Sequence, residues 1–311
     1  MLEIYKCDEA RKLQEQAGSA QSSWIHFTEP TDEEIHDAAC RFRIPIEFIH
    51  APLDSNERSR IQTKDDHLLL NINVPYRTDE KDSVPYRIIP IGIIYTESLI
   101  VTICRQDHLI FRQFMKLDNK KSTFDIGTDF IIQLLQNSAD YYLISLDEID
   151  KKIIAVEKRL QRSVHNKEIY ALLDLNKSLV FFKKSLKSNI NAIEKLVYME
   201  DFNSNEGDER RLQNILIELK QGLAISEIYN MNLSDLMDAY SAVIENNLNV
   251  GLKLLTVFTI ISAIPMAIAS IYGMNIPLPY QDVGSTFLVL MSIGVILSLI
   301  TGWLFYKLRI I

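Results

Sequence analysis

The chain has 311 residues, with 41 Asp and Glu against 33 Lys and Arg, a formal net charge of −8, and 47% hydrophobic residues. After Val250 the charged side chains are Lys253, Asp282, Lys307 and Arg309, so residues 1–250 hold 40 acids against 30 bases and the last 61 residues carry +2. Phosphate binding needs clustered Lys and Arg, so the net negative charge of this part argues against a nucleic-acid-binding surface. Nucleic acid is therefore not expected as a partner.

The N-terminus, MLEIYKCDEA, has neither a basic nor an apolar segment, which predicts that no signal peptide is removed and that this part is cytosolic. Cys7, Cys40 and Cys104 lie far apart without CxxC spacing, so reduced thiols are expected and not a disulfide framework or a zinc site. An enzyme is not expected, because no nucleophile with a base partner can be identified. No metal-ligand spacing connects the six histidines, His26, His36, His50, His67, His108 and His165.

The first part of the chain, residues 1–125, has the pattern of a layered α/β domain. Thr31 precedes a helical stretch and Glu34 follows it by three residues, which is the spacing of a capping box at a helix start. Three segments rich in Ile and Val predict strands, with residues 79–83 as a turn between the first two. These segments are residues 67–76, 86–95 and 98–104.

Residues 91–264 contain no proline, and their periodicity predicts long helices over residues 128–164, 167–202 and 208 onward. We expect residues 126–207 to form a helical hairpin and residues 208–253 a stalk that continues without a break to about residue 272. An apolar stripe on the stalk predicts a packed seam, interrupted by Ser226 and Asn230. The stripe comprises Leu212, Leu216, Leu219, Leu223, Leu233, Met237, Tyr240 and Ile244.

Two uncharged segments, residues 254–272 and 287–306, are long enough to cross a lipid bilayer as helices. Lys253 precedes the first and Lys307 and Arg309 follow the second, while the loop 273–286 has neither Lys nor Arg. By the positive-inside rule, both termini and the tail 307–311 face the cytosol. Aromatic residues near the span ends fit the same placement: Trp303 and Tyr306 inside, Tyr272 and Tyr280 outside. The fold class is thus a membrane protein with a cytosolic α/β domain, a helical stalk and two C-terminal transmembrane helices.

The first span has one face of small, polar or soft residues that recur every three or four positions. Such a face is either a helix-packing surface or the lining of a pore. One two-span hairpin encloses no interior, so a pore requires several copies of the chain. The residues of this face, including its extension into the stalk, are Asn249, Leu252, Thr256, Thr259, Ala263, Met266 and Ser270.

The first span ends in the sequence YGMN at residues 272–275. A Gly-Met-Asn tripeptide at this place, after a long helix and an acidic α/β domain, resembles the CorA family of magnesium transporters over essentially the whole chain. The resemblance implies a homopentamer in the cell membrane, with the first span of each subunit lining a central pore and divalent cations as cargo. No cofactor is implied beyond Mg²⁺ as the transported and regulatory ion, and cytosolic Mg²⁺ bound at acidic residues between subunits would close the pore.

Carried over by position, Gly273, Met274 and Asn275 would form the outer selectivity ring and Asn249 a polar ring near the inner mouth. Leu252 and Leu255 would form the hydrophobic constriction. Thr259, Ala263, Met266 and Ser270 would lie above it. Candidates for regulatory sites are Asp208, Glu209, Glu218, Asp79, Glu80 and Asp82, without a specific pair among them.

The chain departs from the family in two places. The loop residues Ile276 to Asp282 lack the Met-Pro-Glu segment of many members, and the basic C-terminal tail is reduced to Lys307 and Arg309. The ion is therefore left open between magnesium and another divalent metal such as zinc, cobalt or nickel. His and Cys ligands, which softer metals favour, are absent after His165 and Cys104, which tilts the prediction modestly toward magnesium. A membrane-anchored sensor or scaffold that conducts nothing is the alternative of a different class.

Overall fold

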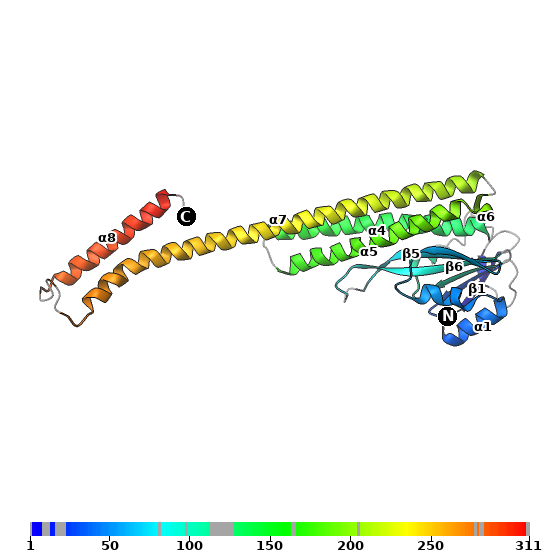
Figure 1. The fold of residues 1–311 in the computed structure, drawn as a ribbon, viewed down its shortest axis with the longest axis horizontal. Coiled ribbons are helices and arrows are strands. Elements are labelled where there is room, and N and C mark those ends of the chain that lie inside the picture. The colour runs from blue at the N-terminus through cyan, green and yellow to red at the C-terminus, as the bar shows by residue number, and fades with distance from the viewer. Residues whose placement is uncertain are drawn as a thin grey trace. The chain divides into compact units, whose positions relative to one another are not determined.

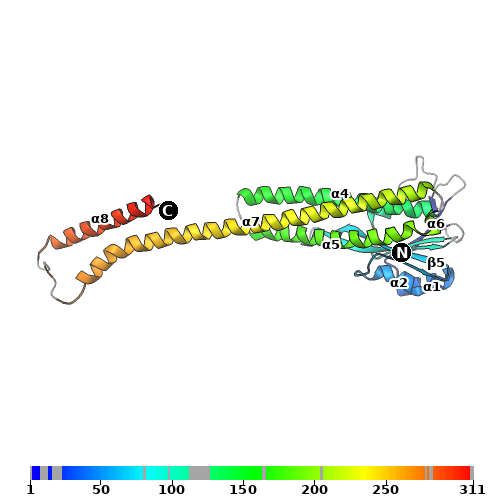
Figure 2. The ribbon, with the colours of Figure 1, turned by 45° about the horizontal axis from the view of Figure 1, so that its top comes forward.

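The structure is a computed structural model that describes residues 2–7, 13–15, 23–79, 82–96, 99–111, 127–162, 166–203, 206–276, 279 and 283–308. For residues 2–7, 13–15, 162 and 203 it describes the backbone alone. The chain divides into two compact units, Met1–Asp235 and Leu236–Ile311. Figures 1 and 2 show the strands, the helices α1, α2, α4, α5 and α6 and the start of α7 in the first unit, and the rest of α7 with α8 in the second.

A seven-stranded sheet forms the centre of the first unit, in the order β2-β1-β3-β7-β6-β5-β4. The strands are β1 (Leu2–Cys7), β2 (Leu13–Glu15), β3 (Ser23–Thr28), β4 (Arg60–Lys64), β5 (His67–Arg77), β6 (Tyr86–Thr96) and β7 (Leu99–Cys104). Strands β3 and β7 pair in parallel and the other neighbours are antiparallel. The three predicted strands are confirmed as β5, β6 and β7, whereas the other four were not predicted. At the β5–β6 turn, Asp82 N donates to Asp79 O at 3.0 Å.

Helix α1 (Asp32–Phe42) begins with the predicted capping box. The Thr31 N–H donates to the Glu34 carboxylate at 2.9 Å, and the Glu34 N–H donates to Thr31 Oγ1 at 3.3 Å. Two N–H groups that lack a partner within the helix are thereby satisfied. The helix ends at Arg43, whose φ of 56° places it in the left-handed region. This local chemistry positions α1 to pack against the sheet.

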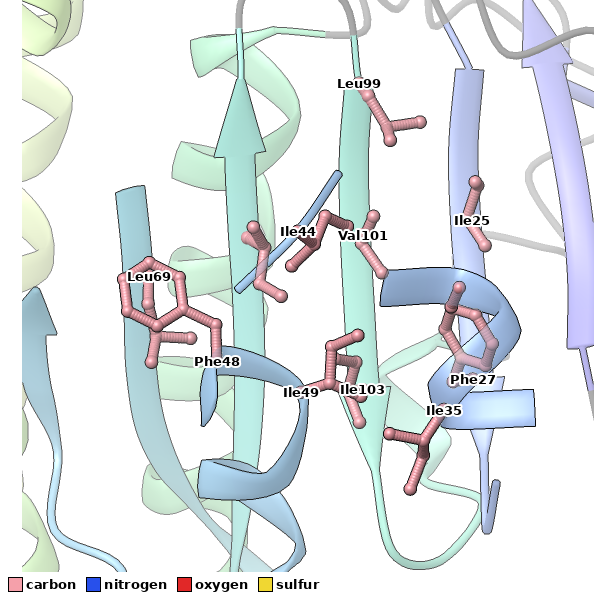
Figure 3. Close-up of a cluster of buried hydrophobic side chains, with 12 residues drawn as sticks. Ile25, Phe27, Ile35, Ile44, Phe48, Ile49, Leu69, Leu99, Val101 and Ile103 are labelled. Carbon is pink, nitrogen blue, oxygen red and sulfur yellow. The ribbon is translucent and has the colours of Figure 1, made fainter. Parts of the chain in front are cut away.

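One face of the sheet is covered by α1, α2 (Ile46–His50) and the short 3-10 helix η1 (Ala51–Leu53). Alternate residues of β3 and β7 point into this layer and meet apolar side chains of the helical segment (Figure 3). The labelled members are Ile25, Phe27, Leu69, Leu99, Val101 and Ile103 from the strands and Ile35, Ile44, Phe48 and Ile49 from the helical segment. At Gly92 the strand approaches η1 so closely that a Cβ would lie 2.6 Å from Pro52 Cγ. The core therefore requires glycine there.

The opposite face of the sheet carries α4 (Thr128–Arg162) and α5 (Asn166–Val197), followed by α6 (Glu200–Asn203) (Figures 1 and 2). Strand β4 begins at Arg60, beside Asn71, so it offers no ladder partner to the backbone of Asn73. The Asn189 side chain of α5 supplies one, because its Oδ1 accepts from Asn73 N at 2.9 Å and its Nδ2 donates to Asn73 O at 2.7 Å. A single amide side chain thus replaces the missing strand.

The predicted long helices are confirmed as α4, α5 and α7 (Glu206–Tyr272), and the last is unbroken as predicted. In the stalk seam, Leu212, Leu219 and Leu233 are buried, while Ile244 is 41% exposed. The two polar positions of the seam bind α5. Ser226 Oγ donates to Leu179 O at 3.1 Å, and Asn230 Nδ2 donates to Asn176 Oδ1 at 2.5 Å. The polar interruptions are therefore contacts between helices and not gaps in the packing.

The second unit consists of the C-terminal part of α7 and of α8 (Thr286–Lys307). Both helices contain a stretch long and apolar enough to cross a membrane, and only 6% of each such stretch is buried. Apolar side chains that remain exposed to this extent are typical of lipid-facing or subunit-facing helices. The architecture agrees with the predicted fold class: a sheet-and-helix domain, a long helix and two apolar C-terminal helices.

Candidate functional site

Helix α7 carries most of the predicted site residues and ends directly before the Gly-Met-Asn tripeptide. Its last residue is Tyr272, and the Gly273 N–H still donates to Ala269 O at 2.9 Å. The Met274 N–H donates to Ile271 O at 3.3 Å, which closes a tighter final turn. Asn275 then lies in the loop with an exposed side chain. The structure thus places the tripeptide as the first residues beyond the helix.

Gly273 has limited room for a side chain. A Cβ at this position would lie 3.2 Å from Ala269 O and 3.6 Å from Ser270 O. Both atoms belong to the backbone of the helix end, so they can give way only if the last turn shifts. Glycine therefore allows the chain to leave the helix without displacing Met274 and Asn275.

Within the second unit, one face of α7 packs against α8. A Cβ added at Gly294 would lie 3.3 Å from Ile268 Cδ1 and 3.6 Å from Pro265, and one added at Gly302 would lie 3.4 Å from Ile261 Cδ1. Small residues permit this close approach of two apolar helices. The face of α7 that carries Ile261, Pro265 and Ile268 is therefore the α8-facing side.

The predicted pore-lining residues occupy the other side of α7. Because a helix turns about 100° per residue, Leu252 and Ser270, nine residues before and after Ile261, lie nearly opposite it. Leu252, Leu255 and Met266 are 52%, 61% and 67% exposed. Among the remaining predicted lining residues, Asn249, Thr256, Thr259 and Ser270 are exposed and Ala263 is half-buried. The structure brings these residues together on one face that α8 of the same chain does not cover.

The hydroxyl groups of this face are turned to their own backbone. Thr256 Oγ1 donates to Leu252 O and Thr259 Oγ1 donates to Leu255 O, both at 2.8 Å. Each hydroxyl proton is therefore engaged within the helix, and the oxygen lone pairs are left to accept hydrogen bonds. Thr256 and Thr259 therefore offer neutral hydrogen-bond acceptors on this face.

Ser298 of α8 has a role that the sequence analysis missed. Pro265 lacks an N–H, so the carbonyl of Ile261, four residues earlier, loses its helical donor. Ser298 Oγ donates to Ile261 O at 3.1 Å and supplies the missing hydrogen bond from the neighbouring helix. A proline inside an apolar span predicts a need for such a donor, so the hydroxyl residues of the second span could have been screened for one.

Four of the acidic residues considered for regulatory metal binding have other partners. Asp208 lies 3.4 Å from Arg211, Asp82 lies 3.1 Å from Arg87, and the carboxylates of Glu209 and Glu218 accept from glutamines at 2.9 Å and 2.5 Å. Within the described ranges, no group of three or more His, Cys, Asp or Glu is arranged to hold a metal ion. Several sequence-level candidates lie outside the described residues: Glu80, His165, Tyr280, Asp282 and Arg309.

Two apolar helices joined to a sheet-and-helix domain define a protein with two candidate membrane-spanning helices and a large polar domain. Residues 19–307 match a family described as CorA-like Mg²⁺ transporter protein. The chain therefore belongs to the CorA-like Mg²⁺ transporter family, whose members are transporters and not enzymes.

Individual relatives agree with this assignment. The chain is 24% identical over 289 residues to the cobalt/magnesium transport protein CorA of Methanocaldococcus jannaschii, covering 91% of this chain and 90% of the relative. It is 24% identical over 297 residues to the magnesium transport protein CorA of Helicobacter pylori strain J99, covering 90% of each. The complete structure of the CorA magnesium transporter from M. jannaschii is similar in fold, with a TM-score of 0.85 at 22% identity over 99% of this chain and 98% of that chain.

Proposed function

We propose that the chain assembles as a homopentamer and carries divalent cations, in the first place Mg²⁺, across the cell membrane into the cytosol. The observation that carries this proposal is the exposed face of α7 opposite its contact with α8. One chain contributes one such face and cannot surround a pore, whereas a ring of symmetric copies can. Five chains are chosen because the family resemblance implies five.

The membrane placement belongs to the same proposal. The spans are residues 254–272 and 287–306, the loop 273–286 is outside, and the tail 307–311 and the N-terminus are cytosolic. The cytosolic part is divided into an α/β domain of residues 1–125, a helical hairpin of residues 126–207 and a stalk of residues 208–253. With Lys253 and Lys307 both at the cytosolic ends of the spans, this orientation follows the positive-inside rule.

Selection takes place where Gly273, Met274 and Asn275 leave the helix. Mg²⁺ prefers oxygen ligands and releases its water reluctantly, so five Asn275 amide oxygens can hold the hydrated ion through its waters. Neutral ligands bind weakly enough for the ion to leave, which conduction requires. The membrane potential supplies the driving force, about 4.6 kcal/mol for a double charge at 100 mV. Asn249 then forms the polar ring near the inner mouth.

A constriction at Leu252 and Leu255 lies next to the ring of Asn249 in this pore. Both side chains are more than half exposed in the single chain, at 52% and 61%, so they are available to meet their copies around a symmetry axis. Apolar rings of this kind gate by excluding water. Above the constriction, Thr256, Thr259, Ala263, Met266 and Ser270 line the pore. Binding of cytosolic Mg²⁺ to acidic residues of the polar domain closes it, at sites that we leave unassigned.

The transported ion has one specific competitor. The relative from M. jannaschii is named as a cobalt/magnesium transport protein, so cobalt, and with it nickel or zinc, is the second candidate cargo. A competition series over Mg²⁺, Co²⁺, Ni²⁺ and Zn²⁺ distinguishes them. A membrane-anchored sensor that conducts nothing is excluded if purified protein in liposomes admits Mg²⁺ under an inside-negative potential, and is supported if it does not.

The filter is tested with Asn275→Ala in the same liposomes, loaded with a magnesium-sensitive dye. Loss of the amide removes the hydrogen bonds to the waters of the ion, and we expect at least about tenfold slower Mg²⁺ influx together with weaker discrimination among the four ions. The matched control is Asn247→Ala, which removes the amide of an exposed asparagine on α7, away from the proposed pore face. Unchanged flux and unchanged ion preference in Asn275→Ala would show that the filter lies elsewhere.

A further inference from the structure

Pro265 divides the apolar stretch of α7 into an inner and an outer segment. The proline offers no N–H to the carbonyl of Ile261 and its ring crowds that carbonyl, so one helical hydrogen bond across this point is lost. Proline is a common cause of helix bending, and α7 bends in its C-terminal part, coloured orange (Figures 1 and 2). The helix itself therefore holds the direction of the outer segment, residues 266–272, less firmly than an intact helix would.

Helix α8 contacts α7 on both sides of this proline. Gly294 lies against the outer segment, because a Cβ added there would come within 3.3 Å of Ile268 Cδ1 and 3.6 Å of Pro265. Ser298, about one turn further along α8, contacts the inner segment, where its Oγ donates to Ile261 O at 3.1 Å. One face of α8 thus connects the two segments that the proline separates.

Ser298 differs from other hydroxyl residues of the same helix in its choice of acceptor. Ser292 and Thr301 each donate to a carbonyl of α8, four residues earlier, at 2.8 Å. Ser298 donates across to Ile261 O, which Pro265 leaves without its helical donor. An unpaired backbone carbonyl in hydrocarbon is costly, so this hydrogen bond favours one arrangement of α8 against the proline.

The outer segment leads directly into the tripeptide that we propose as the filter. The Gly273 N–H donates to Ala269 O at 2.9 Å and the Met274 N–H donates to Ile271 O at 3.3 Å, so the tripeptide starts as a continuation of this segment. From Pro265 to the tripeptide the helix rises by about 12 Å, so a change of about 5° in its tilt moves the filter by about 1 Å. In a ring of symmetric copies, every filter residue moves by the same amount. A displacement of this size is enough to spoil a preorganised site.

We propose that Ser298 is a positioning residue for the filter of the proposed pore. Its hydrogen bond to Ile261 O fixes the tilt of the outer segment at Pro265, and thereby the spacing of the Asn275 amides around the axis. Ser298 itself touches no ion. The role at the filter rests on the proposed function, whereas the effect on the outer segment rests on contacts within the second unit alone.

Hydrogen exchange of the backbone amides of residues 266–274 tests the first step without any transport. It is measured by mass spectrometry on the full chain in liposomes. We expect these amides to exchange about threefold to fivefold faster in Ser298→Ala, the factor that corresponds to one hydrogen bond between membrane helices. Ser292→Ala is the matched control, because it removes a hydroxyl whose acceptor lies in its own helix. Equal exchange in the two variants would overturn the proposal.

The role at the filter is measured as the ratio of Co²⁺ influx to Mg²⁺ influx into the same liposomes. We expect Ser298→Ala to change this ratio about twofold or more, and Ser292→Ala to leave it as it is. An unchanged ratio despite faster exchange in Ser298→Ala would show that the outer segment loosens without any effect on selection, which would overturn the positioning role.

Pro265→Ala tests the route by which Ser298 acts, because it returns an N–H to Ile261 O. In the Pro265→Ala background, Ser298→Ala should change neither the exchange nor the influx ratio any further. The same effect of Ser298→Ala in both backgrounds would mean that Ser298 acts through another contact, and would overturn the proposal. A wild-type chain that admits neither ion would contradict the proposed function and with it the role at the filter. Faster exchange in Ser298→Ala alone would then still identify Ser298 as the residue that fixes the outer segment.

Discussion

The two units of the chain use their apolar residues in opposite ways. In the first unit, β5 and β7 are buried along nearly their whole length, between the α1–α2 layer and the helices α4 and α5. In the second unit, only 6% of the apolar stretch of either helix is buried. The first unit therefore supplies its own core, whereas the apolar surface of the second has to be covered by something outside the single chain.

The hydrogen-bond partners of hydroxyl groups also differ between the two units. In the first unit they connect different elements, as when Tyr142 Oη of α4 contacts Asn73 O of β5 at 2.8 Å and Ser185 Oγ of α5 at 2.7 Å. In the second unit, five hydroxyls donate to a carbonyl of their own helix, four residues earlier: Ser241, Thr256, Thr259, Ser292 and Thr301. Specific packing is thus built by hydrogen bonds in the first unit and by shape in the second.

The self-contained core of the first unit, in contrast to the exposed helices of the second, is tested most strongly at two adjacent phenylalanines of α5. Phe182 is fully buried, with its ring centre 5.5 Å from that of Tyr142 and 5.7 Å from that of Tyr86, whereas Phe181 is 41% exposed. Phe182→Ala should lower the free energy of unfolding of the first unit by about 3–5 kcal/mol because it opens a cavity. Phe181→Ala should cost less than about 1 kcal/mol.

Denaturant unfolding of the full chain in detergent micelles measures both changes. Trp24 and Trp303 are the two tryptophans, so a Trp303→Phe background leaves Trp24, which is buried in the first unit, as the fluorescent reporter. Similar costs for the two substitutions would mean that the first unit lacks the self-sufficient core described above.

The buried histidine of β3 makes the stability of the first unit depend on pH. His26 Nδ1 lies 2.8 Å from Thr102 Oγ1 and its Nε2 lies 3.0 Å from Thr28 Oγ1. Burial lowers the pKa of His26 from 6.5 to about 4, although Asp107 opposes the change. The folded state therefore holds the ring neutral at a pH where the unfolded state already binds a proton.

The lowered pKa of His26 makes the free energy of unfolding decrease as the pH falls. Well above pH 6.5 the ring is neutral in both states, so His26 causes no pH dependence there. Between pH 6.5 and about 4 only the unfolded state binds a proton, so the free energy of unfolding decreases, and below about pH 4 His26 lowers it no further. The full loss is roughly 3 kcal/mol. His26→Gln should flatten this part of the pH profile by about that amount, with exposed His36→Gln as the control. An equally steep profile in His26→Gln would assign the dependence to other groups, such as His108, whose pKa burial also lowers.

Local signals in the sequence identified much of the first unit. The capping box at Thr31, the three strands of Ile and Val, and the seam of α7 depend on neighbouring residues alone. The first two are confirmed, and the seam is buried from Leu212 to Leu233 but exposed at Ile244. Strands β3 and β4 were missed because their pairing is decided by distant partners: β3 pairs with β7, some 76 residues later. β4 is short, with mostly polar residues and an exposed or half-exposed surface, so it has no strong pattern.

The candidate site was predicted in part by the same kind of signal. The spacing of Thr256, Thr259 and Ser270 defined one helical face, and the structure adds that this face lies opposite α8. The sequence could not place Ser298 beside Ile261, because this contact depends on the register between two helices. That register is set by close packing at Gly294 and Gly302, which periodicity within one helix does not contain.

The smallest predicted effect concerns a hydrogen bond that joins α8 to the backbone of α7. Ser298 Oγ donates to Ile261 O, the carbonyl that Pro265 deprives of its helical partner. Ser298→Ala should weaken the second unit by about 1 kcal/mol, within the range measured for hydrogen bonds between membrane helices. Ser292→Ala is the matched control, because Ser292 Oγ donates to Leu288 O of its own helix. Denaturation in mixed micelles measures the difference in stability between the two variants. The signal is the fluorescence of Trp303, identified as the part that is lost in Trp303→Phe. Equal unfolding midpoints for the two serine variants would show that the Ser298 hydrogen bond adds no stability. Shape complementarity alone would then hold α8 against α7, unlike the hydrogen-bonded packing of the first unit.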